Sequence, residues 1–297
     1  MVISGATAVG KTALAVRLAQ YFDTEILSAD SRQVYQRMNI GTAKPSAAEL
    51  EAVTHHFVSS QPLEQTFTAG DFEQQGLKLL KKIFQYRDIV ILVGGTGLYI
   101  QSLCEGLDEY PEIDPAHRKS ITELLENEGI ESLQKALFVA DPLQYSKMDI
   151  QNPQRLVRAL EVCRATGQPF SSFQKKEKKA RFFQPIYVHL EIARSDLYAR
   201  INRRVEQMME DGLLEEAEQL LPFRHLNALQ TVGYQELFDY FDQKTTLLEA
   251  VAMMQQNSRR YAKRQLTWLR KHSHWQLFSL TQFDEIVRMV EKEQRFF

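Results

Sequence analysis

Cysteine is scarce in this sequence: only Cys104 and Cys163 occur among its 297 residues. Two cysteines are too few for a disulfide framework or a cysteine-based zinc site, so we expect both thiols to be reduced. No apolar run approaches the length of a membrane span, and the first residues are typical of a buried strand rather than of a signal peptide. The sequence therefore predicts a cytoplasmic protein that makes no membrane contact.

Neither sign of charge is in excess. The chain has 36 lysines and arginines against 38 aspartates and glutamates, a formal net charge of −2. This balance argues against non-specific coating of nucleic acid, but it leaves room for a local basic surface. Two clusters could form one: Lys175, Lys176, Lys178, Lys179 and Arg181 in the first, and Arg259, Arg260, Lys263, Arg264, Arg270 and Lys271 in the second, where Tyr261 and Trp268 are interleaved.

A phosphate-binding loop stands near the N-terminus. An apolar run precedes this loop, and an apolar-periodic helix follows it. In such a strand–loop–helix arrangement, backbone amides and the helix N-terminus bind phosphate oxygens. The lysine adds a charge, and the threonine hydroxyl can ligate Mg²⁺. The loop therefore predicts a ligand with a diphosphate group without specifying a reaction. The residues that match its G-x-x-x-x-G-K-[ST] pattern are Gly5, Ala6, Thr7, Ala8, Val9, Gly10, Lys11 and Thr12.

Alternating strand and helix patterns predict an α/β fold, a P-loop core with a parallel sheet flanked by helices. Strands are expected at residues 25–29, 89–93 and 185–192, and the continuous apolar run of residues 89–93 is typical of a buried parallel strand. A helix is expected around residues 72–86. In such folds ligands bind at the carboxyl ends of the strands, so the phosphate loop should share its crevice with the other strand ends.

An all-helical insertion is expected to interrupt this core. Residues 115–180 look wholly helical, and one helix there is well marked by Asn152 as its N-cap and Gly167 at its end. We therefore assign residues 1–114 and 181–297 to the catalytic core and residues 115–180 to an insertion domain. After the insertion, long helices are expected near residues 195–221, 233–241, 246–271 and 282–295.

Two strand ends attract attention as possible site positions. Glycines follow strand 89–93, where a nucleotide-hydrolysing motor usually has its Mg²⁺-binding aspartate. Asp30 ends the second strand, where it could bind Mg²⁺, cap the next helix or act as a base, and the residues alone do not favour one of the three. The glycine-rich turn of residues 94–97 is compatible with simple helix entry or with close approach by a ligand.

Positive side chains outside the phosphate loop could complete an anion site. Lys44 lies in a loop and could reach phosphate, although a lone loop lysine is usually solvated. Arg200, Arg203 and Arg204 lie on the helix after the strand expected at residues 185–192, and an arginine from a late helix commonly completes the clamp on a phosphate leaving group.

The sequence resembles the bacterial tRNA dimethylallyltransferases in seven collinear segments that span essentially the whole chain. Ala6, where the family often has proline, is a small departure that the loop should tolerate. The segments are residues 7–12 (TAVGKT), 28–35 (SADSRQVY), 39–45 (NIGTAKP), 94–99 (GGTGLY), 152–161 (NPQRLVRALE), 232–234 (VGY) and 263–268 (KRQLTW).

This resemblance implies a reaction. The family transfers a dimethylallyl group from dimethylallyl diphosphate to the exocyclic N6 amine of the adenine immediately 3′ of the anticodon, in tRNAs that read codons beginning with U. Diphosphate is released and no ATP is consumed. The resemblance implies Asp30 as the general base and Thr7 and Arg204 as contacts of the diphosphate, and the phosphate-loop pattern itself makes Thr12 the expected ligand of Mg²⁺.

The resemblance also implies contacts with the anticodon stem-loop of tRNA, and we expect a monomer to make them. A base in a loop can be splayed out at little cost to reach a buried site. The residues expected at this interface are Asp30, Ser31, Arg32, Gln33, Thr96, Arg118, Gln154, Arg155, Leu156, Val157, Arg158, Gln230, Thr231, Val232, Gly233, Tyr234 and Gln235.

Two other classes share part of this pattern. A small-molecule or nucleotide kinase would share the loop, the strand-end aspartate and the arginines, but it needs neither a long helical insertion nor basic C-terminal helices. A nucleic-acid-binding ATPase without transferase activity should have an aspartate where Gly94 and Gly95 stand.

Overall fold

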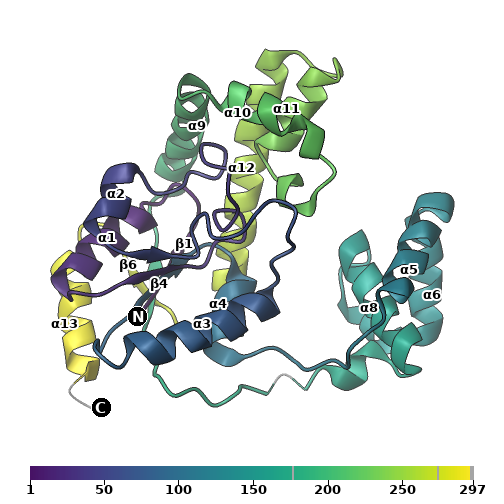
Figure 1. Cartoon of the computed structure of the whole chain (residues 1–297), viewed down its shortest axis with the longest axis horizontal. Helices are drawn as coiled ribbons and strands as arrows, with labels where there is room; N and C mark the ends of the chain where they lie inside the picture. Colours follow the sequence, from purple (N-terminus) through teal and green to yellow (C-terminus); the bar gives the residue numbers. More distant parts are fainter. Residues whose placement is uncertain (176, 273, 295–297) are drawn as a thin grey trace. The chain divides into compact units, whose positions relative to one another are not determined.

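The computed structural model describes residues 1–175, 177–272 and 274–294. The chain divides into two compact units, a core unit of Met1–Glu105 with Arg181–Phe297 and a helical unit of Gly106–Ala180 (Figure 1). The helical unit starts before residue 115, because Tyr110 and Ile113 pack against its hydrophobic core.

A parallel sheet organises the core unit, with the strand order β3-β2-β4-β1-β5-β6. Ile3 of β1 pairs with Val93 of β4 on one side and with Val188 of β5 on the other. The predicted fold class is thereby confirmed. The strands are β1 (Val2–Gly5), β2 (Ile26–Ser28), β3 (His55–His56), β4 (Ile91–Gly94), β5 (Tyr187–Leu190) and β6 (Gln276–Phe278).

Helices of the core unit surround this sheet (Figure 1). They are α1 (Lys11–Tyr21), α2 (Ala47–Ala52), α3 (Ala69–Ile83), α4 (Gly97–Glu105), α9 (Arg194–Glu210), α10 (Leu213–Leu220), α11 (Tyr234–Phe241), α12 (Leu247–Leu269) and α13 (Phe283–Gln294), with short 3₁₀ turns η2 (Leu221–Phe223) and η3 (Asn227–Leu229).

The two faces of the sheet pack against different helices, because side chains alternate along each strand. Ile3 and Ile91 face a core that includes α1 and α13. Leu27 and Leu92 point to the opposite face, where they meet side chains of α3 and α4. Both faces are covered, which explains the continuous apolar run that leads into β4.

The helical unit has a hydrophobic core of its own. Ile121, Leu133 and Leu137 are fully buried there. The predicted helix start is confirmed, since the amide of Arg155 donates to the Asn152 side chain at 3.2 Å. Its elements are α5 (Pro115–Glu128), α6 (Ile130–Ala140), α7 (Pro142–Lys147), α8 (Pro153–Thr166) and the 3₁₀ turn η1 (Phe170–Phe173).

Two expectations about secondary structure were wrong, and two strands were missed. The helix expected at residues 195–221 is two helices, because Gly212 adopts φ +98° and ends α9 before α10 begins. The described residues after η1, up to residue 180, are not helical. The sequence analysis also missed the edge strands β3 and β6, which are short and lack an apolar run.

None of the described helices is long and apolar enough to cross a membrane.

Leu137→Ala should loosen the helical unit and leave the core unit unchanged. Truncation of a fully buried leucine costs about 2–5 kcal/mol of stability. Native-state hydrogen exchange should therefore become faster for amides of α5, α6 and α8, with β1 and β4 unaffected. Val139→Ala, at an 82% exposed position of the same helix, is the matched control and should change neither set. Faster exchange in β1 or β4 of the Leu137 variant would show that the two units unfold together.

Candidate active site

The phosphate loop follows β1 and adopts a conformation that suits anion binding. Gly10 has φ +109° and Ala8 has φ +65°, so the backbone turns sharply before α1. The Lys11 ammonium folds over the loop and donates to the carbonyls of Gly5 and Ala6 at 3.0 and 2.8 Å. The loop is thus held in shape by its own lysine, at the N-terminus of a helix.

Lys11 is an unusual lysine. Burial, assisted by repulsion from Arg204 and opposed by attraction to Asp30, lowers the pKa of its ammonium to about 8. A bound diphosphate would favour the charged form of this side chain. The protonation state of Lys11 therefore depends on whether an anion is bound in the loop.

Arginines of α9 reach the phosphate loop. The Arg204 guanidinium donates to the Thr7 hydroxyl at 3.4 Å, and Arg200 donates to the carbonyl of Val9 at 3.3 Å. Arg204 is largely buried, and burial lowers its pKa. Two positive side chains, Lys11 and Arg204, therefore lie beside one loop, as expected of a site for a multiply charged anion.

Asp30 follows β2 and lies beside the loop. Its Oδ1 accepts from the amides of Arg32 and Gln33 at 2.9 and 3.2 Å, so it caps the turn that follows the strand. No other hydrogen bond involves its carboxylate among the described residues, which leaves the second oxygen available for a ligand. Burial and the neighbouring Asp30 charge raise the pKa of Tyr261 to about 12.

Two cavities meet at these residues. One, of about 300 Å³, opens over the phosphate loop and includes Lys11, Thr12 and Gly95 in its lining. The other, of about 370 Å³, extends toward α9, α11 and α12. Their shared residues are Thr7, Asp30, Thr42, Ala43, Arg204 and Tyr261.

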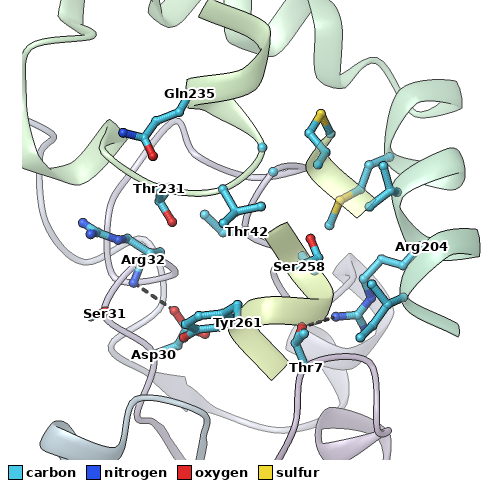
Figure 2. A pocket seen from close by; sticks show the side chains of 18 of the residues that line it. Thr7, Asp30, Ser31, Arg32, Thr42, Arg204, Thr231, Gln235, Ser258 and Tyr261 are labelled. Carbon is cyan, nitrogen blue, oxygen red and sulfur yellow. Dashed lines mark hydrogen bonds between the residues drawn. The ribbon is translucent and has the colours of Figure 1, made fainter. Parts of the chain in front are cut away.

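Figure 2 shows the larger cavity, in which Asp30 and Tyr261 lie beside each other, with Thr7 and Arg204 at the same end. Ser31 lies next to Asp30, and Arg32, Thr231 and Gln235 lie on the side away from Arg204. Part of the wall is apolar and comprises Ile201, Val205, Met208, Val232 and Met254.

Helix α12 packs tightly against the glycine-rich turn after β4. A Cβ added to Gly95 would lie 2.1 Å from the Gln265 side chain, and one added to Gly97 would lie 2.4 Å from the Trp268 ring. A Cβ on Gly94 would meet the Ala29 backbone at 2.2 Å. The glycines therefore admit neighbouring parts of the protein. Gly94 and Gly95 also line the smaller cavity, so close approach by a ligand stays a prediction.

The loop that contains Lys44 is held by internal contacts. The Lys44 ammonium donates to the Tyr35 carbonyl at 2.6 Å and to the Asn39 and Ser59 side chains. Gln33 donates to the carbonyls of Thr42 and Ala43 at 3.1 and 2.9 Å. Lys44 lines the smaller cavity, but its polar atoms are occupied by this scaffold.

Glu216 was missed by the sequence analysis, and it joins two of the seven segments. Its carboxylate accepts from the amides of Asn39, Ile40 and Gly41 at 2.8–3.1 Å. The Tyr234 hydroxyl donates to the same carboxylate at 2.7 Å. No sequence signal distinguishes this glutamate from others on an exposed helix, because its partners are backbone amides of a distant loop.

The loop before α11 forms one side of the larger cavity. Arg32 donates to the carbonyl of Asn227 at 2.8 Å, and Gln235 donates to the Gln230 side chain at 2.8 Å. Gln230, Thr231, Val232, Gly233 and Gln235 line the cavity. Tyr234 is fully buried, so its side chain supports this loop from inside and is not available to an RNA.

Thr96 lies beside the turn that contains Ser31, because its hydroxyl accepts from the amide of Ser31 at 3.0 Å. The turns after β2 and β4 are thereby joined beside Asp30.

Predicted site residues of the helical unit fall into two groups. Arg118 and Arg158 both approach the Glu161 carboxylate, at 3.6 and 3.0 Å, and Arg118 also donates to Gln154 at 3.4 Å. Arg155 has an exposed side chain. Leu156 and Val157 are instead buried in the hydrophobic core of the unit, so their side chains cannot contact RNA.

The two basic clusters differ: two residues of the first are held in ion pairs, whereas Arg260, Lys263, Arg264, Arg270 and Lys271 of the second are exposed. Arg181 makes a buried ion pair with Glu73 at 2.7 Å, and Lys179 pairs with Glu109 at 2.9 Å. In the second cluster Tyr261 and Trp268 face the candidate site and the turn after β4. Lys176 lies outside the described residues.

The donor set beside the phosphate loop fits Mg²⁺ brought together with a diphosphate. Among the described residues, no group of three histidine, cysteine, aspartate or glutamate side chains could hold a metal ion alone. The smaller cavity offers the Thr12 hydroxyl and the Asp30 and Glu49 carboxylates. Mg²⁺ is usually held by one or two protein ligands together with substrate phosphates and water.

Comparison with known proteins places this geometry in a family. The IPP transferase family model matches residues 33–272. The tRNA dimethylallyltransferase of Christiangramia forsetii is 48% identical, over 95% of this chain and 93% of that protein. The enzyme of the same name from Flavobacterium johnsoniae is 45% identical, over 97% of this chain and 96% of that protein.

Solved structures agree. A tRNA isopentenylpyrophosphate transferase from Bacillus halodurans is similar with a TM-score of 0.73 and 34% identity, over 99% of this chain and 96% of that one. A eukaryotic dimethylallyltransferase studied while acting on tRNA has a TM-score of 0.75 at 27% identity, over 95% of this chain and 75% of that one. The chain belongs to the IPP transferase family, alongside the tRNA dimethylallyltransferases.

Proposed function

We propose that this protein transfers a dimethylallyl group from dimethylallyl diphosphate to the N6 amine of the adenine 3′-adjacent to the anticodon, in tRNAs that read codons beginning with U. The names of the relatives described above support transfer of a dimethylallyl group to tRNA. One structural observation supports it most: a phosphate cavity and a second, partly apolar cavity meet at Thr7, Asp30 and Arg204. Two substrates can therefore enter separately and react where the cavities join.

In this proposal the smaller cavity holds the diphosphate. Amides of the phosphate loop, Lys11 and Arg204 would bind its oxygens, and the Thr7 hydroxyl lies beside Arg204. Mg²⁺, held through Thr12 and the phosphate oxygens, would supply further neutralisation of charge on the leaving group. The apolar wall of the larger cavity suits the hydrocarbon tail.

The transfer forms one carbon–nitrogen bond and breaks one carbon–oxygen bond, and one proton moves from the nitrogen to a carboxylate. The adenine amine nitrogen attacks the first carbon of the dimethylallyl group, and the bond from that carbon to the diphosphate oxygen breaks. The bonding electrons leave with the diphosphate, where Lys11 and Arg204 stabilise the developing charge. The nitrogen loses a proton to the free oxygen of Asp30, which restores a neutral amine.

The RNA would approach from the side of the larger cavity that Ser31, Arg32 and Gln235 line. Arg32 and Gln235 are held by neighbouring backbone and side-chain groups, so their loops are ordered before RNA binds. In the helical unit, Arg118, Arg155 and Arg158 are among the side chains that could contact phosphates. Such contacts fix the position of the RNA, while the flipped base is recognised in the cavity.

A direct assay tests the proposed function. The protein is incubated with Mg²⁺, radiolabelled dimethylallyl diphosphate and a tRNA that reads a U-starting codon. Label should enter the tRNA, and a transcript with guanine in place of the target adenine should remain unlabelled. Absence of label in the first tRNA would contradict the proposal, and transfer of phosphate from labelled ATP to a small acceptor would indicate a kinase instead.

Asp30→Asn should lower the single-turnover rate by about 10²–10⁴-fold, the usual contribution of a positioned general base. The amide keeps an oxygen that can accept from the Arg32 and Gln33 amides, so the turn cap survives while the basic oxygen is lost. Rapid-quench measurements with saturating substrates give this rate. Affinities for both substrates should stay close to those of the native protein. A nearly native rate would show that the proton leaves by another route.

The specificity constant for dimethylallyl diphosphate should fall at high pH. Lys11 has a pKa of about 8 before the diphosphate binds. Its ammonium is charged below that pH and neutral above it, so kcat/KM should decline about tenfold per pH unit on the alkaline side. Lys11→Met should have a lower kcat/KM that lacks this decline. If the decline persists in the methionine variant, another group is responsible.

Arg155→Gln should weaken tRNA binding and reduce the slope of log Kd against log salt by about one. Arg155 is the best single probe, because removing Arg118 or Arg158 would also take away one of the two ion-pair partners of the buried Glu161 carboxylate. Filter binding at several salt concentrations measures the slope. Gln151→Ala, at an exposed position outside the predicted interface, serves as the control. An unchanged slope would argue against a phosphate contact here.

A further inference from the structure

Gln265 joins the ends of two strands through hydrogen bonds of its side chain, and the proposed mechanism gives this residue no role. Its side chain lies on α12 and is only 8% exposed. Its Oε1 accepts from the amide of Thr7 at 2.8 Å, and its Nε2 donates to the carbonyl of Gly95 at 3.0 Å. One amide group therefore ties the phosphate loop after β1 to the turn after β4.

The bond to Thr7 determines what the phosphate loop can do. The Thr7 amide is engaged by Gln265, so it is not among the amides free to bind phosphate. What Thr7 offers instead is its hydroxyl, which lies 3.4 Å from Arg204. A shift of the Thr7 backbone would move this hydroxyl away from the guanidinium and from the leaving group.

Gly95 supports the same arrangement. Its backbone does not lie in the left-handed region, so an alanine could adopt its conformation. A Cβ there would nevertheless lie 2.1 Å from Nε2 of Gln265, and its three nearest neighbours would all be Gln265 atoms. Glycine at this position therefore keeps space for the glutamine side chain.

We propose that Gln265 is a positioning residue of the transfer reaction, which acts through Thr7 and holds the phosphate loop ready for the diphosphate leaving group. The inference rests on the proposed function for its catalytic consequence. In this proposal Gln265 does not contact RNA, although it lies in a basic segment of α12. Its effect should therefore be confined to the diphosphate side of the reaction.

Gln265→Met tests the hydrogen bonds while keeping most of the side-chain volume. Loss of two hydrogen bonds should raise KM for dimethylallyl diphosphate or lower the single-turnover rate, with a combined loss of about 10- to 100-fold in kcat/KM. The dissociation constant for tRNA should stay within about twofold, because phosphate-loop geometry is not part of that contact. Thr267→Ala, an exposed change on the same helix, is the control. A native kcat/KM, or an equal loss of tRNA affinity, would overturn the proposal.

A double-mutant cycle with Gly95 tests the bridge itself. Gly95→Ala should reproduce the defect of Gln265→Ala, because the added methyl group displaces the glutamine. In the double variant the methyl group has room, so the defect should equal that of Gln265→Ala alone. If the loss of kcat/KM in the double variant equalled the product of the two single losses, Gly95 and Gln265 would act independently. That result would overturn the proposal.

Binding of inorganic diphosphate with Mg²⁺, measured by calorimetry, separates this inference from the proposed function. If the native protein binds diphosphate but labels no tRNA, the proposed function fails. Weaker diphosphate binding by Gln265→Met would then still support the positioning role. Unchanged diphosphate binding in that variant would overturn the role whatever the native protein catalyses.

Discussion

Parallel pairing of β2, β4, β1 and β5 is the interaction on which the rest of the site depends. Because these strands run in one direction, their carboxyl ends meet at one edge of the sheet. The phosphate loop follows β1, Asp30 follows β2, and the glycine-rich turn follows β4. The helix that carries Arg204 comes after β5. Functional groups from four distant parts of the chain thus lie close together at one edge of the sheet, and none of these segments needs an unusual fold.

Bringing these groups together places two positive side chains close to each other, and the protein neutralises their repulsion only in part. Lys11 and Arg204 repel each other across the phosphate loop, and both lose hydration there, which lowers the pKa of each. Asp30 offsets only part of this repulsion. A bound diphosphate relieves this repulsion. The free energy that the repulsion costs in the empty site is therefore recovered when the ligand binds. The same positive charges then face the oxygen on which negative charge develops.

Much of this could be predicted from the sequence, because the informative signals are local. The phosphate loop, the strand ending at Asp30 and the helix start at Asn152 each depend on residues within a few positions of one another. Glu216 and Gln265 could not be assigned roles, because their partners are backbone groups far away in the chain. Gln265 was visible within a family-like segment, but its bonds to Thr7 and Gly95 needed coordinates.

Burial explains the remaining differences between expectation and structure. Leu156, Val157 and Tyr234 belong to segments of family-like sequence, yet their side chains lie inside their units. A motif therefore mixes residues that contact a substrate with residues that support them, and spacing alone cannot separate the two. The glycines of residues 94–97 show the same point, since they fit packing neighbours, which a sequence cannot reveal.

The return of the chain at Arg181 explains how the core unit tolerates a long insertion. Arg181 forms a buried ion pair with Glu73 of α3 and donates to the Ser102 carbonyl of α4 at 2.7 Å. The chain leaves the core unit after α4 and comes back beside it, so the insertion is a loop whose ends are closed by core contacts. The entropic cost of closing a loop grows only slowly with its length. A helical unit with a hydrophobic core of its own can offset that cost, and the sheet need not change to accommodate it.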